Sequence, residues 1–149
     1  MWSELKRYQG ASAVHKHLLW EALFALAIAR IVMAFVPFRR IAGWLGSPGI
    51  ESPTTATPED TRTAEAIGWA VGVLGQRVPW DGRCLAQALA ATGMLRRRGM
   101  EGTVTLGVRE GKAAGFDAHA WLRMGSCIVT GGPGHEEYKP FTTFARRHS

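Results

Sequence analysis

The stretch RCLAQALAATGMLRRRGMEGTVTLGV, residues 83–108, contains the point at which the sequence pattern changes from helix to strand. Between Arg83 and Arg98 apolar residues recur on one face at helical spacing, and Gly99 follows as a left-handed cap. From residue 103 to 108 apolar residues alternate with Thr and Gly, which predicts a strand. Helices are expected before this point and antiparallel strands after it, so the sequence predicts the α+β class.

Two more strands are expected on the C-terminal side. Residues Phe116 to Met124 alternate with period two, and Gly125-Ser126 is typical of a tight hairpin turn into a strand at residues 127–130. A turn at Glu110-Gly111-Lys112 precedes the first of them. The alternation puts four side chains on one side of that strand: Asp117, His119, Trp121 and Arg123.

On the N-terminal side, a helix is expected from Pro58 to about Gly75. Thr57 is a suitable N-cap, Pro58 suits the first helical position, and two acidic residues fall in the first turn. A turn at Pro79-Trp80-Asp81-Gly82 separates this helix from the next. Residues 46–58 contain three prolines among Gly, Ser and Thr, which indicates an irregular connection before the helix that starts at Pro58. We therefore divide the chain into an apolar helical segment (1–45), a linker (46–57) and a core (58–149).

The apolar stretch from Leu18 to Val36 is long enough to cross a bilayer. Glu21 and Arg30 interrupt it, and each charge costs a few kcal/mol at the bilayer centre. It also lacks the small-residue cleavage site of a signal peptide. We therefore expect a cytoplasmic protein whose apolar helix packs on the core, on a partner or peripherally along a membrane surface.

Composition excludes several classes of protein. The chain has 149 residues, of which 46% are hydrophobic, so it suits one packed domain and not a disordered chain. The net charge of +6 is spread along the sequence, and the run Arg96-Arg97-Arg98 suits a helix end better than a nucleic-acid arm. Two cysteines without a CxxC motif exclude a disulfide scaffold and a zinc finger. We expect no metal, no cofactor and no nucleic-acid partner.

Cys84 and His119 are the candidate catalytic pair. Cys84 falls in the first turn of a predicted helix, where unpaired N–H groups and the helix dipole favour a thiolate, although a free cysteine is also often just a small buried residue. His119 is the only histidine in the middle of a predicted strand, and it can serve as the base that a nucleophilic cysteine needs. Alternatively, it is a structural histidine whose polar atoms are satisfied within the sheet.

Several motifs resemble the stand-alone leader peptidases of lasso-peptide biosynthesis, which belong to the transglutaminase-like superfamily. They are Arg83-Cys84-Leu85, Ala88-Leu89, Leu95-Arg96-Arg97-Arg98-Gly99, Leu106-Gly107-Val108-Arg109, Ala118-His119-Ala120-Trp121, and Pro37-Phe38-Arg39-Arg40 at the end of the apolar helix. The resemblance implies a papain/transglutaminase-like core, in which a nucleophile helix packs on a small antiparallel sheet.

The same resemblance implies a cysteine peptidase that removes the leader from a lasso-peptide precursor, with Cys84 as nucleophile and His119 as general base and acid. A separate leader-binding protein would deliver the precursor, and an ATP-dependent macrolactam synthetase would use the product. Two alternatives remain open. One is a transglutaminase-like acyl transferase that uses the same dyad, and the other is a membrane-associated scaffold without catalytic activity.

The third catalytic group stays unassigned. The resemblance implies an acid near the end of the strand after His119, but residues 130–134 contain no carboxylate. Asp117 and Glu136 are the candidates, and a backbone carbonyl or an amide side chain is another way to orient the imidazole. Cys127 is expected only to pack.

Overall fold

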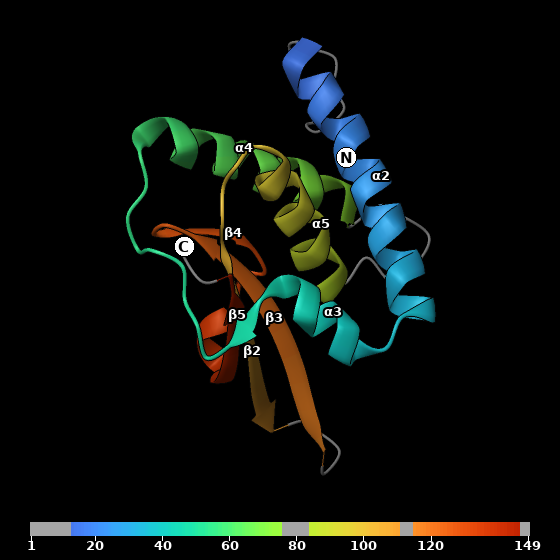
Figure 1. The fold of residues 1–149 in the computed structure, drawn as a ribbon, viewed down its shortest axis with the longest axis vertical. Coiled ribbons are helices and arrows are strands. Elements are labelled where there is room, and N and C mark those ends of the chain that lie inside the picture. The colour runs from blue at the N-terminus through green and yellow to red at the C-terminus, as the bar shows by residue number, and fades with distance from the viewer. Residues whose placement is uncertain (1–12, 76–83, 111–114, 147–149) are drawn as a thin grey trace.

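A computed structural model describes residues 13–75, 84–110 and 115–146, which form a layer of helices packed on a sheet (Figure 1). The helices are α2 (Ala13–Phe35), α3 (Phe38–Leu45), α4 (Pro58–Gly75) and α5 (Cys84–Arg97), with a 3₁₀ turn η1 (His135–Glu137). The strands are β1 (Ser47–Pro48), β2 (Thr103–Glu110), β3 (Phe116–Met124), β4 (Cys127–Thr130) and β5 (Lys139–Ala145). The predicted α+β class is confirmed.

The five described strands form one antiparallel sheet in the order β1-β5-β2-β3-β4. β2 and β3 pair over eight positions, and Gly107 lies opposite His119. Gly125 has a φ of 60°, and Met124 pairs with Cys127, which gives the predicted two-residue hairpin turn. The β2–β3 pairing therefore fixes the position of His119 on the sheet.

α3, β1 and β5 are not anticipated by the sequence patterns. Pro140 lies in β5, although a proline ordinarily argues against a strand. It pairs with Gly107 at the point where the β2–β5 register shifts, between Leu106 and Gly107. An irregular ladder at this point does not need the N–H that proline lacks. β1 falls within the expected linker and pairs with β5 through only two residues.

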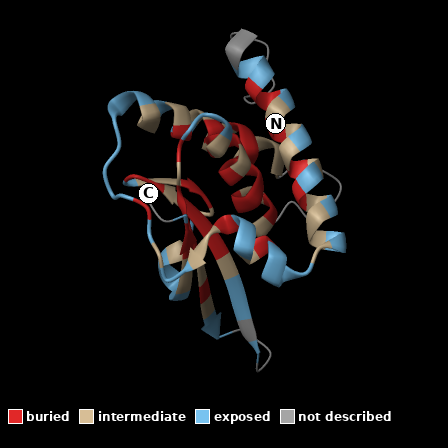
Figure 2. Cartoon of the chain, viewed as in Figure 1, coloured by how far each residue is buried: buried red, intermediate tan, exposed pale blue. Residues whose placement is uncertain are grey.

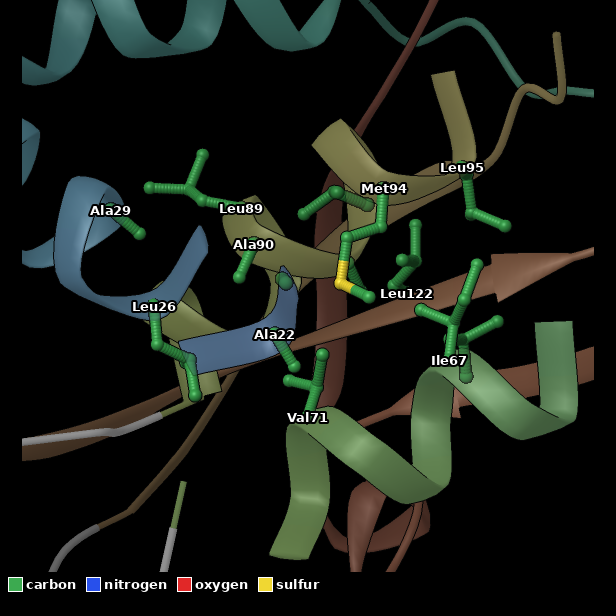
Figure 3. Packing of buried hydrophobic residues seen from close by; sticks show 14 of the residues in the cluster. Ala22, Leu26, Ala29, Ile67, Val71, Leu89, Ala90, Met94, Leu95 and Leu122 are labelled. Carbon is green, nitrogen blue, oxygen red and sulfur yellow. The ribbon is translucent and has the colours of Figure 1, made fainter. Parts of the chain in front are cut away.

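α5 packs between the other helices and the sheet, since it contacts α2, α4, β3 and β4. Figure 3 shows side chains from α2, α4, α5 and β3 around Met94, which is almost fully buried. Four alanines of α5 are buried as well, and small side chains let neighbouring elements approach closely. The position of α5, and of its first residue, is therefore fixed by packing on several sides.

The helix ends confirm the expected caps. The N–H of Asp60 donates to Oγ1 of Thr57 at 3.1 Å, so Thr57 is the N-cap of α4. Gly99 has a φ of 74°, and the N–H of Met100 donates to the carbonyl oxygen of Leu95 at 3.0 Å, which closes α5. The expected turns at 79–82 and 110–112, and Arg83 with them, lie wholly or partly outside the described residues.

The arginine run at the end of α5 joins the helices. Arg98 donates to both carboxylate oxygens of Glu21 in α2, at 2.7 and 2.9 Å, and Arg97 lies 3.2 Å from the same carboxylate. Arg96 donates to the carbonyl oxygens of Trp44 and Leu45, which cap the end of α3. The run thus has an internal structural role, as its expected place at a helix end suggests.

α2 starts earlier than expected, at Ala13, and ends at Phe35. By length and apolar composition its segment His15–Phe35 is able to cross a membrane. One face of α2 nevertheless packs on α4 and α5, and Glu21 is bound by the arginines of α5. The helix is therefore part of the folded domain.

Candidate active site

Cys84 is the first residue of α5, and its side chain is half-buried. α5 packs against β3, the strand that carries His119, so the two candidate residues lie on elements in direct contact (Figure 1). The N–H groups in the first turn of an α-helix have no partner within the helix. They can stabilise negative charge at or next to the Cys84 sulfur.

The imidazole of His119 is held by the backbone. Its Nε2 lies 2.7 Å from the carbonyl oxygen of Gly131, which directly follows β4. A carbonyl oxygen can only accept a hydrogen bond, so Nε2 carries the proton and, in the neutral ring, Nδ1 carries the lone pair. This contact identifies Nδ1 as the atom that can take a proton from a nucleophile.

Position 131 accepts only glycine. Its φ is 71°, and a Cβ added there would lie 2.4 Å from the carbonyl oxygen of Ala120. The region in which the resemblance implies an acid thus presents a backbone carbonyl to His119. Among the described residues, a backbone carbonyl therefore holds the imidazole at Nε2.

Two aromatic rings contact the imidazole of His119. The ring centroid of Tyr138 lies 4.9 Å away and that of Trp121 lies 5.8 Å away, each at an interplanar angle of 30°. A Cβ on Gly107 would lie 2.9 Å from the indole of Trp121, so glycine provides the space in which that ring lies. These contacts restrict rotation of the imidazole and keep Nδ1 in one direction.

Asp117, one of the two acidic candidates, forms an ion pair with another side chain. Its carboxylate lies 3.5 Å from Nε of Arg109. The guanidinium of Arg109 also binds Glu137 and stacks on the ring of Tyr138 at 4.6 Å. Among the described residues no hydrogen bond joins Asp117 to His119.

Glu136, the other acidic candidate, lies in η1 and is exposed. Its carboxylate is 3.6 Å from Nδ1 of His135, which in turn lies 2.6 Å from the carbonyl oxygen of Gly132. No described contact joins Glu136 to His119. The structure therefore brings neither carboxylate to the imidazole.

Cys127 opens β4 as a half-buried free thiol. Burial, and secondarily the charge of Glu65, raises the pKa of the Cys127 thiol. A thiol of raised pKa is a poor nucleophile at neutral pH, which agrees with the packing role that the sequence predicts. Cys84 is also a free thiol.

Sequence patterns do not identify Tyr138 and Gly131 as neighbours of His119. The glycine-rich run at 130–134 signals only an unusual backbone, and Tyr138 reaches the site because β5, which follows it, pairs with β2. Within the described ranges, no three His, Cys, Asp or Glu side chains form a group that could hold a metal ion.

Comparison with known proteins identifies the family. A family model described as the transglutaminase-like superfamily matches residues 32–144, which include Cys84, His119 and Gly131. Neither a search of curated proteins nor a search of solved structures gave a match. Members of this superfamily are typically cysteine peptidases or acyltransferases. Because the match covers well over half of the chain, the protein belongs to the transglutaminase-like superfamily.

Proposed function

We propose that the protein is a cysteine peptidase that removes the leader from a ribosomally synthesised lasso-peptide precursor. Two observations support this assignment: membership of the transglutaminase-like superfamily, and the motifs Arg83-Cys84-Leu85 and Ala118-His119-Ala120-Trp121. The observation that carries the chemistry is the 2.7 Å contact between His119 Nε2 and the Gly131 carbonyl oxygen, because it leaves Nδ1 as the base.

In the first half of the proposed reaction, Nδ1 of His119 takes the proton of the Cys84 thiol. The sulfur then forms a bond to the carbonyl carbon at the end of the leader, and the N–H groups in the first turn of α5 stabilise the oxyanion. The C–N bond breaks, and the imidazolium gives its proton to the leaving amine. The products are a thioester on Cys84 and a core peptide with a free α-amine.

In the second half, water attacks the thioester and gives a proton to Nδ1 of His119. The C–S bond breaks, the sulfur recovers its proton, and the leader leaves with a carboxylate. If an amine replaced water in this step, the enzyme would be an acyltransferase. The two activities share the dyad and differ only in the nucleophile that resolves the thioester.

The proposal includes two partner proteins. A separate leader-binding protein would hold the precursor next to the site, since positioning a substrate can supply several kcal/mol of the barrier. The amine released by cleavage is the group that an ATP-dependent macrolactam synthetase would join to an acidic side chain of the core. Cleavage would thus precede ring closure.

The test is incubation of the purified protein with precursor peptide, with and without the leader-binding protein, in the presence or absence of a primary amine. Mass spectrometry should detect a leader with a free carboxylate, and should detect it faster when the binding protein is present. A leader joined to the added amine would support the acyltransferase instead. No product under any of these conditions would favour the scaffold without catalytic activity.

A further inference from the structure

α2 carries a second apolar face, opposite the face that packs on the core. Five large side chains on it are each more than half exposed: Trp20, Phe24, Ile28, Ile31 and Phe35. At about 100° per residue they fall within an arc of about 80° and extend over roughly 22 Å of helix. The buried residues of α2, Leu18, Leu19, Ala22, Leu26 and Ala29, lie on the opposite side. Figure 2 shows α2 at the edge of the molecule, with exposed segments along it.

An apolar groove of about 760 Å³ borders this exposed row and lies between α2, α3 and α5. Ala29 and Val32 of α2 and Leu89 and Met94 of α5 contribute apolar surface to it. None of the groove residues belongs to the candidate active site. An exposed row and a groove of this size together form an apolar surface that soluble monomers rarely leave uncovered.

The charges around this surface are mainly positive. Arg39 and Arg40 of α3 are exposed and make no ion pair with other described residues, and Arg40 and Arg97 line the groove. Arg30 of α2 lies on the side of the helix that faces away from the groove. Glu21 is the only acidic residue of α2 and α3, and Arg97 and Arg98 already bind it. Because Arg39 and Arg40 add positive charge beside the apolar row, a ligand that is both apolar and anionic would complement this surface.

We propose that the α2–α3 surface, defined by the exposed row and the groove, docks on a bilayer that contains anionic phospholipids. The exposed side chains would enter the interface between headgroups and acyl chains, with α2 parallel to the membrane plane. The arginines beside them would meet lipid phosphates, each arginine strengthening binding about fivefold at an anionic surface. The proposal goes beyond the peptidase assignment and does not depend on it.

Charge and shape favour a bilayer over a protein partner. A second copy of the chain would present the same arginines, and the like charges would repel each other. The exposed row is a convex ridge on one helix, to which fluid acyl chains adapt, whereas a protein would need a groove of matching length. In this orientation α5 lies between α2 and β3, the strand that carries His119 (Figure 1).

The test is flotation of the full chain with vesicles of phosphatidylcholine alone or of equal parts phosphatidylcholine and phosphatidylglycerol. The protein should float with the anionic vesicles, float less with the neutral ones, and bind more weakly as salt is added. Arg39→Gln with Arg40→Gln should weaken binding about 25-fold, the product of two fivefold losses. Arg62→Gln, an exposed arginine on α4, is the matched control and should change little.

The apolar contribution is tested in the same way. Ile31→Asn with Phe35→Asn should abolish flotation, whereas Phe141→Asn, an exposed phenylalanine on β5, should not. Equal binding to neutral and anionic vesicles, or no binding of the unaltered protein to either, would overturn the proposal. So would dimerisation in solution that the α2 variants abolish, or recovery from membranes only with detergent after carbonate treatment. Cleavage of precursor in solution should be unchanged in every variant, which separates this test from that of the peptidase.

Discussion

The imidazole of His119 donates its Nε2 hydrogen to the carbonyl oxygen of Gly131, over a donor–acceptor distance of 2.7 Å. A backbone carbonyl thus occupies the place of the carboxylate that a cysteine triad would supply. An acid would stabilise the imidazolium by charge, whereas the carbonyl fixes the tautomer and direction of the ring with a dipole only. The proposed mechanism therefore depends on the conformation of the backbone at one glycine.

Gly131→Ala should lower kcat by at least tenfold. The added methyl group would collide with the Ala120 carbonyl, and the resulting shift would move the acceptor away from His119. Gly134→Ala is the matched control, because its φ of 78° is similar but a Cβ there meets nothing within 4 Å. Gly134→Ala should lose about 1 kcal/mol of stability from the left-handed backbone, and Gly131→Ala should lose more because of its collision with the Ala120 carbonyl.

Only Gly131→Ala should also slow alkylation of Cys84 by iodoacetamide, which we would measure in a Cys127→Ala background. Equal effects of the two glycine variants on kcat and on alkylation would show that the Gly131 carbonyl does not act through His119.

His119→Ala should reduce cleavage by a factor of about 10² to 10⁴, as expected for loss of a general acid and base. Combined with Cys84→Ala it should add scarcely any further loss, because residues that act in one step are not additive. Single-turnover cleavage of the precursor measures the loss in His119→Ala and the further loss in the double variant. If the two defects multiplied, the residues would act in separate steps.

Asp117→Asn and Glu136→Gln should each slow turnover less than tenfold, which corresponds to about 1.4 kcal/mol. Asp117 pairs with Arg109 and Glu136 with His135, and neither contacts the imidazole. Steady-state kinetics of both variants beside the unaltered enzyme would check this. A loss of a hundredfold or more in either would assign that carboxylate to the catalytic group.

Glu21→Gln should loosen α2 and change the response of stability to acid. The hydrogen bonds from Arg98, and the charges of Arg98 and Arg97, lower the pKa of Glu21 against the opposing effect of burial. A lowered pKa in the folded state gives stability that is present above the ordinary value of 4.5 and is lost as the pH falls through the folded value.

The variant should therefore be less stable at neutral pH, by about 1 kcal/mol at most because the pair is partly exposed. Its stability should also fall less steeply in acid. Urea unfolding at a series of pH values measures both, and parallel curves for the two proteins would contradict the assigned role of Glu21.

Periodicity and caps predict the elements whose signals are local. The strand Phe116–Met124 and the helix Pro58–Gly75 have the bounds that alternation, Thr57 and Pro58 indicate. β5 has no such signal, because Pro140 argues against a strand unless the register shift at Gly107 is known. α3 is eight residues long with only Ile41 and Leu45 buried, which is too short a pattern to stand out.

The residues of the candidate site likewise separate into those with a local sequence signal and those without one. Cys84 and His119 are identifiable from the sequence because their residue types and positions in predicted elements carry the chemistry. Every residue has a backbone carbonyl, so the sequence cannot show that the carbonyl of Gly131 lies next to Nε2 of His119. Only the fold reveals this contact. Tyr138 directly precedes β5 and contacts the imidazole because β5 pairs with β2, a pairing that local sequence patterns do not show.

The most direct measurement is cleavage of the precursor, in the presence of the leader-binding protein, by the Cys84→Ala and Cys127→Ala variants. The two substitutions remove the same atom from two half-buried free thiols, so they differ in position alone. Cys84→Ala should keep the folded state and release free leader only at a residual rate by mass spectrometry, while Cys127→Ala should cleave at close to the unaltered rate. Cleavage by Cys84→Ala at the unaltered rate would contradict the assignment of Cys84 as nucleophile.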